Sequence, residues 1–138
     1  MGCDIHVHIE IKVGGQWHHY NQPYFNRNYN LFAKIAGVRG DGTEEAIAPD
    51  RGIPEDATFT TLFEYERRKD DYYSMTWLSL EEIAELEEWY KIHVRGGISF
   101  NHDGINYLCG SSFSFFLKHR EEYPPELEDA RMVCWFDG

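Results

Sequence analysis

The amino-terminal segment carries the densest set of side chains that could do chemistry. Residues 3–10 read Cys-Asp-Ile-His-Val-His-Ile-Glu, with an ionisable group at every second position from Asp4 onward. On a β-strand, residues two apart point to the same face and lie about 6.7 Å apart at Cα. Two imidazoles at that spacing can reach one divalent ion, so His6 and His8 are candidate ligands with Asp4 beside them. Asp4 and Glu10 lie about 20 Å apart by the same rise, so all four groups cannot bind one metal.

A further ligand has to come from elsewhere in the chain. The candidates are His102 or Asp103, in a turn with glycine, and Asp137, at the end of the last predicted strand. Mixed histidine and carboxylate ligands suit Zn²⁺, Mn²⁺ or Fe²⁺, and an open position would hold a hydroxide near neutral pH. This pattern predicts hydrolysis. Two alternatives stay open: acid–base work by the imidazoles without metal, and the solvated side of an ordinary strand.

The element that must position these groups is a half-buried strand over residues 1–13, in which apolar and polar residues alternate. Gly14-Gly15 predicts a primed turn and a hairpin with a second strand over 16–20. His18 and His19 must point to opposite faces of that strand. One of them can neighbour the histidines of the first strand, although an exposed pair is the simpler expectation for a short strand.

Caps and apolar spacing predict three helices. They are expected over residues 29–36, 80–92 and 111–120. The second is the clearest, because Ser79 and Glu82 have the spacing of a capping box.

The remaining chain supplies strands and a long loop. β-Prone residue types predict a strand over 58–65, and an apolar run predicts a central strand over 130–136. Residues 38–56 are expected to form a long loop. The sequence therefore predicts one domain, residues 1–138, of the α+β class. It consists of a single layer of mostly antiparallel sheet, with two or three helices packed on one face.

Composition limits the partners. Lys and Arg number 13 against 24 Asp and Glu, which gives a net charge of -11. Such a chain is not expected to bind nucleic-acid backbones or anionic membranes. A small anionic ligand is still compatible with it, and Arg39 and Arg51, which flank the long loop, are the first candidates to bind one. Each is otherwise a surface ion-pair partner. The absence of an apolar run of about 18 residues, and three widely spaced cysteines, predict a cytoplasmic protein.

The first six residues, Met-Gly-Cys-Asp-Ile-His, resemble the start of a family of small uncharacterised proteins from bacteriophages and bacteria. Shorter segments spread over most of the chain add to the resemblance: 27–29, 36–39, 77–80 and 135–137. The chain has Gly138 where that family would have Asn. The resemblance implies a phage-encoded protein of the host cytoplasm and no defined activity. By analogy, small phage proteins often act on host factors or nucleotide signals.

Three functional hypotheses follow. The first is a metal-dependent hydrolase of a small phosphoester or nucleotide, centred on Asp4, His6 and His8, with Arg39 or Arg51 orienting the substrate. The second is a binding module, monomeric or homo-oligomeric, that captures a small anionic or nucleotide ligand. The third is an interaction protein whose acidic surface meets a basic partner, for which the three amino-terminal groups would be exposed and unpaired.

Overall fold

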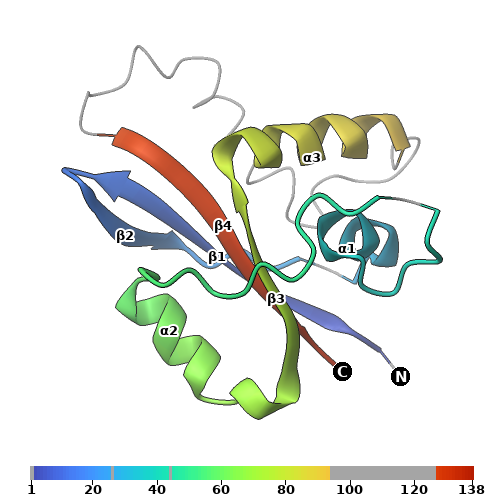
Figure 1. Ribbon diagram of the computed structural model, residues 1–138, viewed down its shortest axis with the longest axis horizontal. Coiled ribbons are helices and arrows are strands. Elements are labelled where there is room, and N and C mark those ends of the chain that lie inside the picture. Colours follow the sequence, from blue (N-terminus) through green and yellow to red (C-terminus); the bar gives the residue numbers. More distant parts are fainter. Residues whose placement is uncertain (1, 26, 44, 94–126) are drawn as a thin grey trace.

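The computed structural model describes residues 2–25, 27–43, 45–93 and 127–138. In them the chain forms a four-stranded antiparallel sheet in the order β2-β1-β4-β3 (Figure 1). The strands are β1 (Asp4–Val13), β2 (Gln16–Asn21), β3 (Tyr72–Ser79) and β4 (Leu127–Asp137). The helices are α1 (Tyr29–Ala36), α2 (Phe59–Glu66) and α3 (Leu80–His93), with a 3-10 turn, η1, at Lys69–Asp71. The predicted α+β class is confirmed.

One face of the sheet forms the hydrophobic core, as the alternation along β1 predicts. Buried apolar side chains of β1 and β4 lie on it together with those of α1 and α3. The Phe32 ring of α1, for example, packs edge-on against Phe136 of β4 at a centroid distance of 5.3 Å. The contributions of the strands and of the residue just before β1 are Cys3, Ile5, Val7, Ile9, Leu78, Ala130, Met132, Cys134 and Phe136. The opposite face of β1 is therefore the one that carries Asp4, His6, His8 and Glu10.

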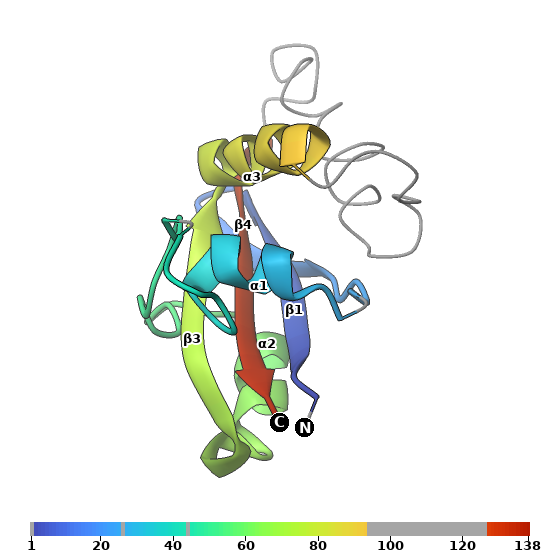
Figure 2. The same ribbon diagram turned by 90° about the vertical axis from the view of Figure 1, so that its right-hand side faces the viewer.

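The helices are divided between the two faces, and this corrects the expectation that all would lie on one. Figure 2 shows α1 in front of the sheet and α2 behind it. Thr61 of α2 donates a hydrogen bond to Glu10, and the Tyr65 ring packs 5.4 Å from that of Trp135. The second helix therefore covers the polar face of β1. No helix in the described part of the chain has the length and apolar character needed to cross a membrane.

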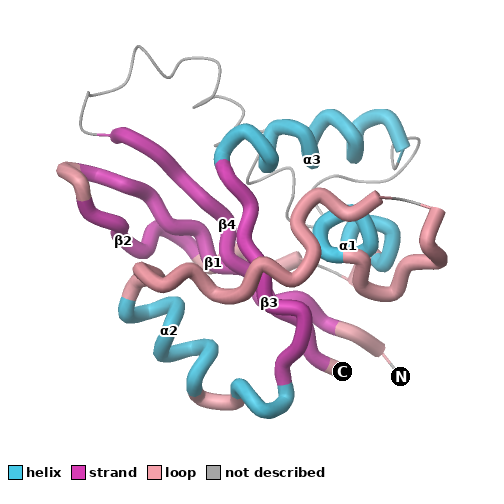
Figure 3. The backbone as a smooth tube through the Cα atoms, in the orientation of Figure 1, coloured by secondary structure: helices cyan, strands magenta, loops and turns pink. Residues whose placement is uncertain are grey.

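The first and last strands are direct neighbours at the centre of the sheet, as predicted for the carboxy-terminal strand. The antiparallel register runs from Asp4 opposite Asp137 to Val13 opposite Leu127. The two ends of the chain consequently lie side by side (Figures 1 and 3). This register brings the histidines of β1 next to the final residues of β4.

The region 58–79 differs from its prediction. Residues 58–65, expected as a strand, form the cap and most of α2, because the Thr58 side chain accepts a hydrogen bond from the Thr61 amide and begins a helix. Strand β3, Tyr72–Ser79, was not anticipated. The predicted helix over 111–120 and the turn with His102 and Asp103 lie outside the described residues.

The other caps are confirmed. Asn28 and Gly37 cap α1, and Ser79 and Glu82 exchange the two hydrogen bonds of a capping box at the start of α3. We expect Ser79→Ala to lower the free energy of unfolding by about 1 kcal/mol, because the Glu82 amide loses its acceptor. Urea denaturation measures this. Ser79→Asp, which keeps an acceptor, should stay close to wild type; an equal loss in both variants would contradict the capping role.

Candidate functional site

The polar face of β1 holds a row of ionisable side chains that are all paired. Asp4, His6, His8 and Glu10 point to the same face, as predicted, and each has a different partner. Helix α2 and the loop before it cover the middle of the row, so His8 and Glu10 are fully buried. Such a row is not the solvated side of an ordinary strand.

His6 forms a close pair with Asp137, the last residue of β4. Its Nε2 lies 2.5 Å from Asp137 Oδ2, and the two side chains are 34% and 22% exposed. A carboxylate can only accept, so Nε2 carries the hydrogen of this bond and, in the neutral ring, Nδ1 is a bare acceptor. No residue of the described ranges hydrogen-bonds to Nδ1. The pair thus presents a proton acceptor, fixed in its tautomer by a carboxylate, at a surface that solvent reaches.

Aromatic rings surround the His6 imidazole. Trp135 lies nearly parallel to it at 6.1 Å, and Tyr72 lies at 5.2 Å and tilted by 49°. Tyr65 of α2 packs against both of these rings. The cluster restricts the rotation of the imidazole. Trp135 is fully buried, whereas Tyr65 and Tyr72 are partly exposed and form the aromatic surface beside His6.

Asp4 lies next to this pair but is engaged elsewhere. Arg27 donates to both carboxylate oxygens, from Nε at 2.7 Å and from a terminal nitrogen at 3.3 Å. The hydrogen bonds from Arg27 lower the pKa of Asp4 below its usual value. Since Asp4 is the Cα partner of Asp137, an ion pair lies beside the His6–Asp137 pair.

His8 is buried and pairs with a histidine of β2. Its Nδ1 lies 3.0 Å from His19 Nε2, and its ring stacks on Trp135 at 5.0 Å. His18, the neighbouring residue, is exposed, so the hairpin does bring one of the two β2 histidines to the β1 row. Burial, and then the proximity of His19, lower the pKa of His8 to about 4. This imidazole is therefore neutral at pH 7 and has a structural role.

Glu10 is the acceptor of a buried network. Arg131 Nε donates to it at 2.7 Å, and the Thr58 amide and Thr61 hydroxyl donate to its other oxygen at 2.8 Å. Burial alone would raise the pKa of Glu10, but these hydrogen bonds outweigh it and the pKa is lowered. Arg131 also donates to Asp56, so the network joins β1, β4, α2 and the loop before α2.

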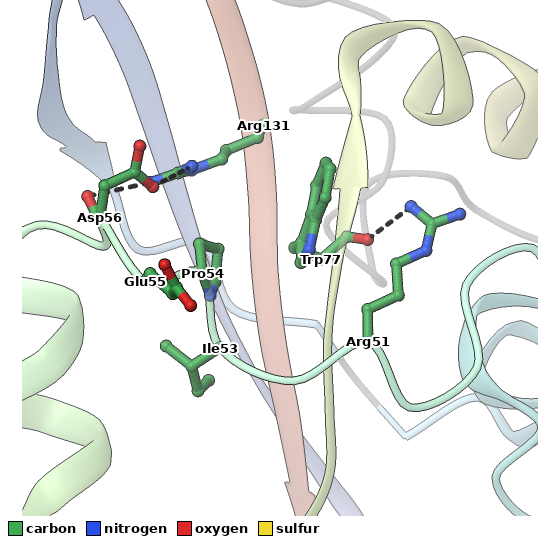
Figure 4. A pocket seen from close by; sticks show the side chains of 7 residues that line it. All are labelled: Arg51, Ile53, Pro54, Glu55, Asp56, Trp77 and Arg131. Atoms are coloured by element: carbon green, nitrogen blue, oxygen red, sulfur yellow. Dashed lines mark hydrogen bonds and ion pairs between the residues drawn. The ribbon is translucent and has the colours of Figure 1, made fainter.

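A pocket of about 440 Å³ lies on the same side of the sheet as this network. Its lining residues are Arg51, Ile53, Pro54, Glu55, Asp56, Trp77 and Arg131 (Figure 4). The loop before α2 forms one wall, and Trp77 of β3 with Arg131 of β4 forms the other. None of the histidines in the described part of the chain lines it.

The two arginines expected to bind an anion are held by the protein itself. Arg51 donates twice to Glu82, at 2.6 Å each, and to two main-chain carbonyls. Arg39 lies over the Tyr29 ring with its guanidinium carbon 5.1 Å from the centroid. Of the two, only Arg51 lines the pocket.

The predicted metal ligands do not converge. Asp4 turns to Arg27, His8 to His19, and only His6 and Asp137 meet. Within residues 2–25, 27–43, 45–93 and 127–138, no three His, Cys, Asp or Glu side chains are grouped to hold a metal ion. His102 lies outside these ranges.

The role of Arg131 was missed from the sequence. It is the single charged residue within the apolar run 130–136, where burial of a charge requires a partner. That signal, read together with Glu10 on the polar face of a neighbouring strand, could have indicated the pair. The stacking of Trp135 on the histidines had no comparable signal.

No family model, curated protein or solved structure matches this chain.

Proposed function

We propose that the protein is a hydrolase of a small phosphoester or nucleotide in which His6, oriented by Asp137, is the group that transfers the proton. The carrying observation is the 2.5 Å contact between His6 Nε2 and Asp137 Oδ2, with His6 one-third exposed among aromatic rings. A histidine with its second nitrogen free and its tautomer fixed is the arrangement that general-base catalysis needs.

In this proposal His6 Nδ1 accepts a proton from a water molecule as that water attacks the phosphorus of the substrate. Asp137 accepts the hydrogen bond from Nε2–H and stabilises the imidazolium that forms. The proton then passes from Nδ1 to the leaving oxygen. Tyr72, which is partly exposed beside His6, supplies the stacking surface for a planar substrate such as a nucleobase.

A divalent metal is the second form of the proposal. His6 and Asp137 already meet, and Asp4 is the Cα partner of Asp137, so release of Asp4 from Arg27 would bring a third ligand, a second carboxylate, to this end of the sheet. Zn²⁺, Mn²⁺ and Fe²⁺ accept such ligands. The hypothesis of an interaction protein, which requires Asp4, His6 and His8 to be exposed and unpaired, is not supported, because all three are paired.

The test is incubation of untagged protein with a panel of nucleotides and small phosphoesters, with and without EDTA, followed by chromatography of the products. Turnover that survives EDTA supports the metal-free mechanism. Loss of turnover with EDTA, restored by added Zn²⁺ or Mn²⁺, supports the metal form. A ligand that binds and is recovered intact would contradict hydrolysis and favour capture. The resemblance of the first six residues to phage and bacterial proteins supports the further proposal that this activity acts in the cytoplasm of a phage-infected cell.

A further inference from the structure

The pocket next to Trp77 has a charge opposite to the one expected of an anion site. Arg51 and Arg131 line it, but both guanidinium groups already donate to carboxylates. Arg51 binds Glu82 through both terminal nitrogens, and Arg131 binds Glu10 and Asp56. These arginines therefore offer a ligand little free positive charge.

The unsatisfied groups of the pocket are carboxylate oxygens. Glu55 is exposed and makes no hydrogen bond or ion pair with the described residues, and Asp56 uses one oxygen for Arg131 while its side chain is 66% exposed. Glu55 and Asp56 line the pocket, and Glu10 and Glu82 are bound to its two arginines. Two guanidinium groups are thus accompanied by four carboxylates. The net charge around the cavity is negative, in line with the charge of -11 on the whole chain.

An aromatic wall completes the pocket. Figure 4 shows Glu55 and Asp56 of the loop across the pocket from Trp77, with the Arg131 side chain reaching to Asp56. The Arg51 guanidinium lies 5.2 Å from the centroid of the Trp77 ring, and the same indole lines the pocket. An aromatic face opposite carboxylates is the usual environment for an ammonium or guanidinium group. The volume of about 440 Å³ is that of a small-molecule site.

We propose that this pocket binds a small organic cation through an ammonium or guanidinium group held between Trp77 and the carboxylates of Glu55 and Asp56. This site is separate from the His6–Asp137 pair and does not depend on the proposed hydrolysis.

Isothermal titration calorimetry with arginine and spermidine tests the proposal, with citrulline as the neutral analogue of arginine and AMP as an anion. We expect the two cations to bind and citrulline to bind at least about fivefold more weakly than arginine, because the urea group carries no charge. Equal binding of arginine and citrulline, or binding of AMP alone, would overturn it. Tenfold tighter binding of a peptide with one internal arginine than of free arginine would also overturn the proposal that the ligand is a small molecule.

Two substitutions locate the site. Glu55→Gln should weaken arginine binding about threefold to fivefold, since it removes one partly exposed charge. Glu45→Gln, the same change at an exposed acid outside the lining, should leave binding unchanged. Trp77→Leu should weaken it about fivefold or more. Equal effects of the two glutamate variants would refute the location even if Trp77→Leu fails to fold. His6→Gln should leave arginine binding unchanged, which separates this site from the proposed catalytic pair.

Discussion

Replacing Glu10 by Ala is expected to lower the free energy of unfolding by about 3–5 kcal/mol. Glu10 is fully buried and accepts from Arg131, Thr58 and Thr61. Its removal leaves Arg131, whose side chain is 8% exposed, without its buried counter-charge. It also leaves the Thr61 hydroxyl without its acceptor, and an unpaired buried charge or donor is costly.

The position of this network explains why the effect should be global. Arg131 also donates to Asp56 and lies over the Trp17 ring at 3.9 Å, so one side chain joins the two central strands, the edge strand β2 and the loop before α2. Loss of Glu10 therefore loosens the attachment of α2 to the sheet as well as one ion pair.

Urea denaturation followed by tryptophan fluorescence measures the loss, and Asp4→Ala is the matched control. Asp4 is also a β1 carboxylate paired with an arginine, but 48% of its side chain is exposed. Water replaces such a partner, so the control should lose far less stability. Similar losses in the two variants would contradict a buried network. A Glu10→Leu, Arg131→Met double variant should recover part of the stability.

The second large effect is a loss of stability in mild acid caused by His8. Its side chain is fully buried, lies against Trp135 and pairs with His19, and its Nε2 has no hydrogen-bond partner in the described structure. Burial and His19 together lower its pKa from 6.5 to about 4. The folded protein therefore resists a proton that the unfolded chain accepts.

The direction of the effect follows from this difference. Above pH 6.5 the imidazole is neutral in both states and the folded protein has its full stability. As the pH falls from 6.5 towards 4, only the unfolded chain takes up the proton, and about 3 kcal/mol is lost over that interval. The pKa of His19 is lowered by burial too, which adds a loss of the same sign. The lowered pKa of Glu10 adds a further loss below its ordinary value of 4.5.

Urea denaturation at a series of pH values between 7.5 and 4.5 measures this dependence, with His8→Phe as the comparison. Phenylalanine keeps an aromatic ring against Trp135 but cannot titrate. We expect wild type to lose about 2–3 kcal/mol more than His8→Phe over this range. Parallel profiles for the two proteins would show that His8 is not the group responsible.

Local patterns predicted the parts of the fold that local interactions determine. The alternation along β1, the Gly14-Gly15 turn and the Ser79 capping box need only neighbouring residues, and all three are present. The strand predicted over residues 58–65 was wrong, because β-branched and aromatic residue types favour a strand locally. In the structure Thr58 caps a helix, and hydrogen bonds from Thr58 and Thr61 to Glu10 hold that helix on the sheet. Such a contact spans about fifty residues and leaves no local pattern.

The candidate site was predictable in its residues but not in its pairing. Asp4, His6 and His8 share a face because of strand geometry, and Asp137, at the end of the last strand, was a predicted further metal ligand. Which residue meets which depends on the register of β1 with β4, which places Asp4 opposite Asp137, and on a hairpin that brings His19 to His8. The pairing of Asp4 with Arg27 depends in turn on the loop before α1.

The central claim is that His6 transfers the proton. The most direct test compares wild type and His6→Gln in their rates of turnover of whichever nucleotide or phosphoester of the panel is hydrolysed. The account predicts a loss of about a hundredfold or more in His6→Gln, because a positioned general base contributes that much. His18→Gln, the same change at the exposed histidine of β2, should retain the wild-type rate. An unchanged rate in His6→Gln, or no turnover of any panel member by the wild-type protein, would contradict it.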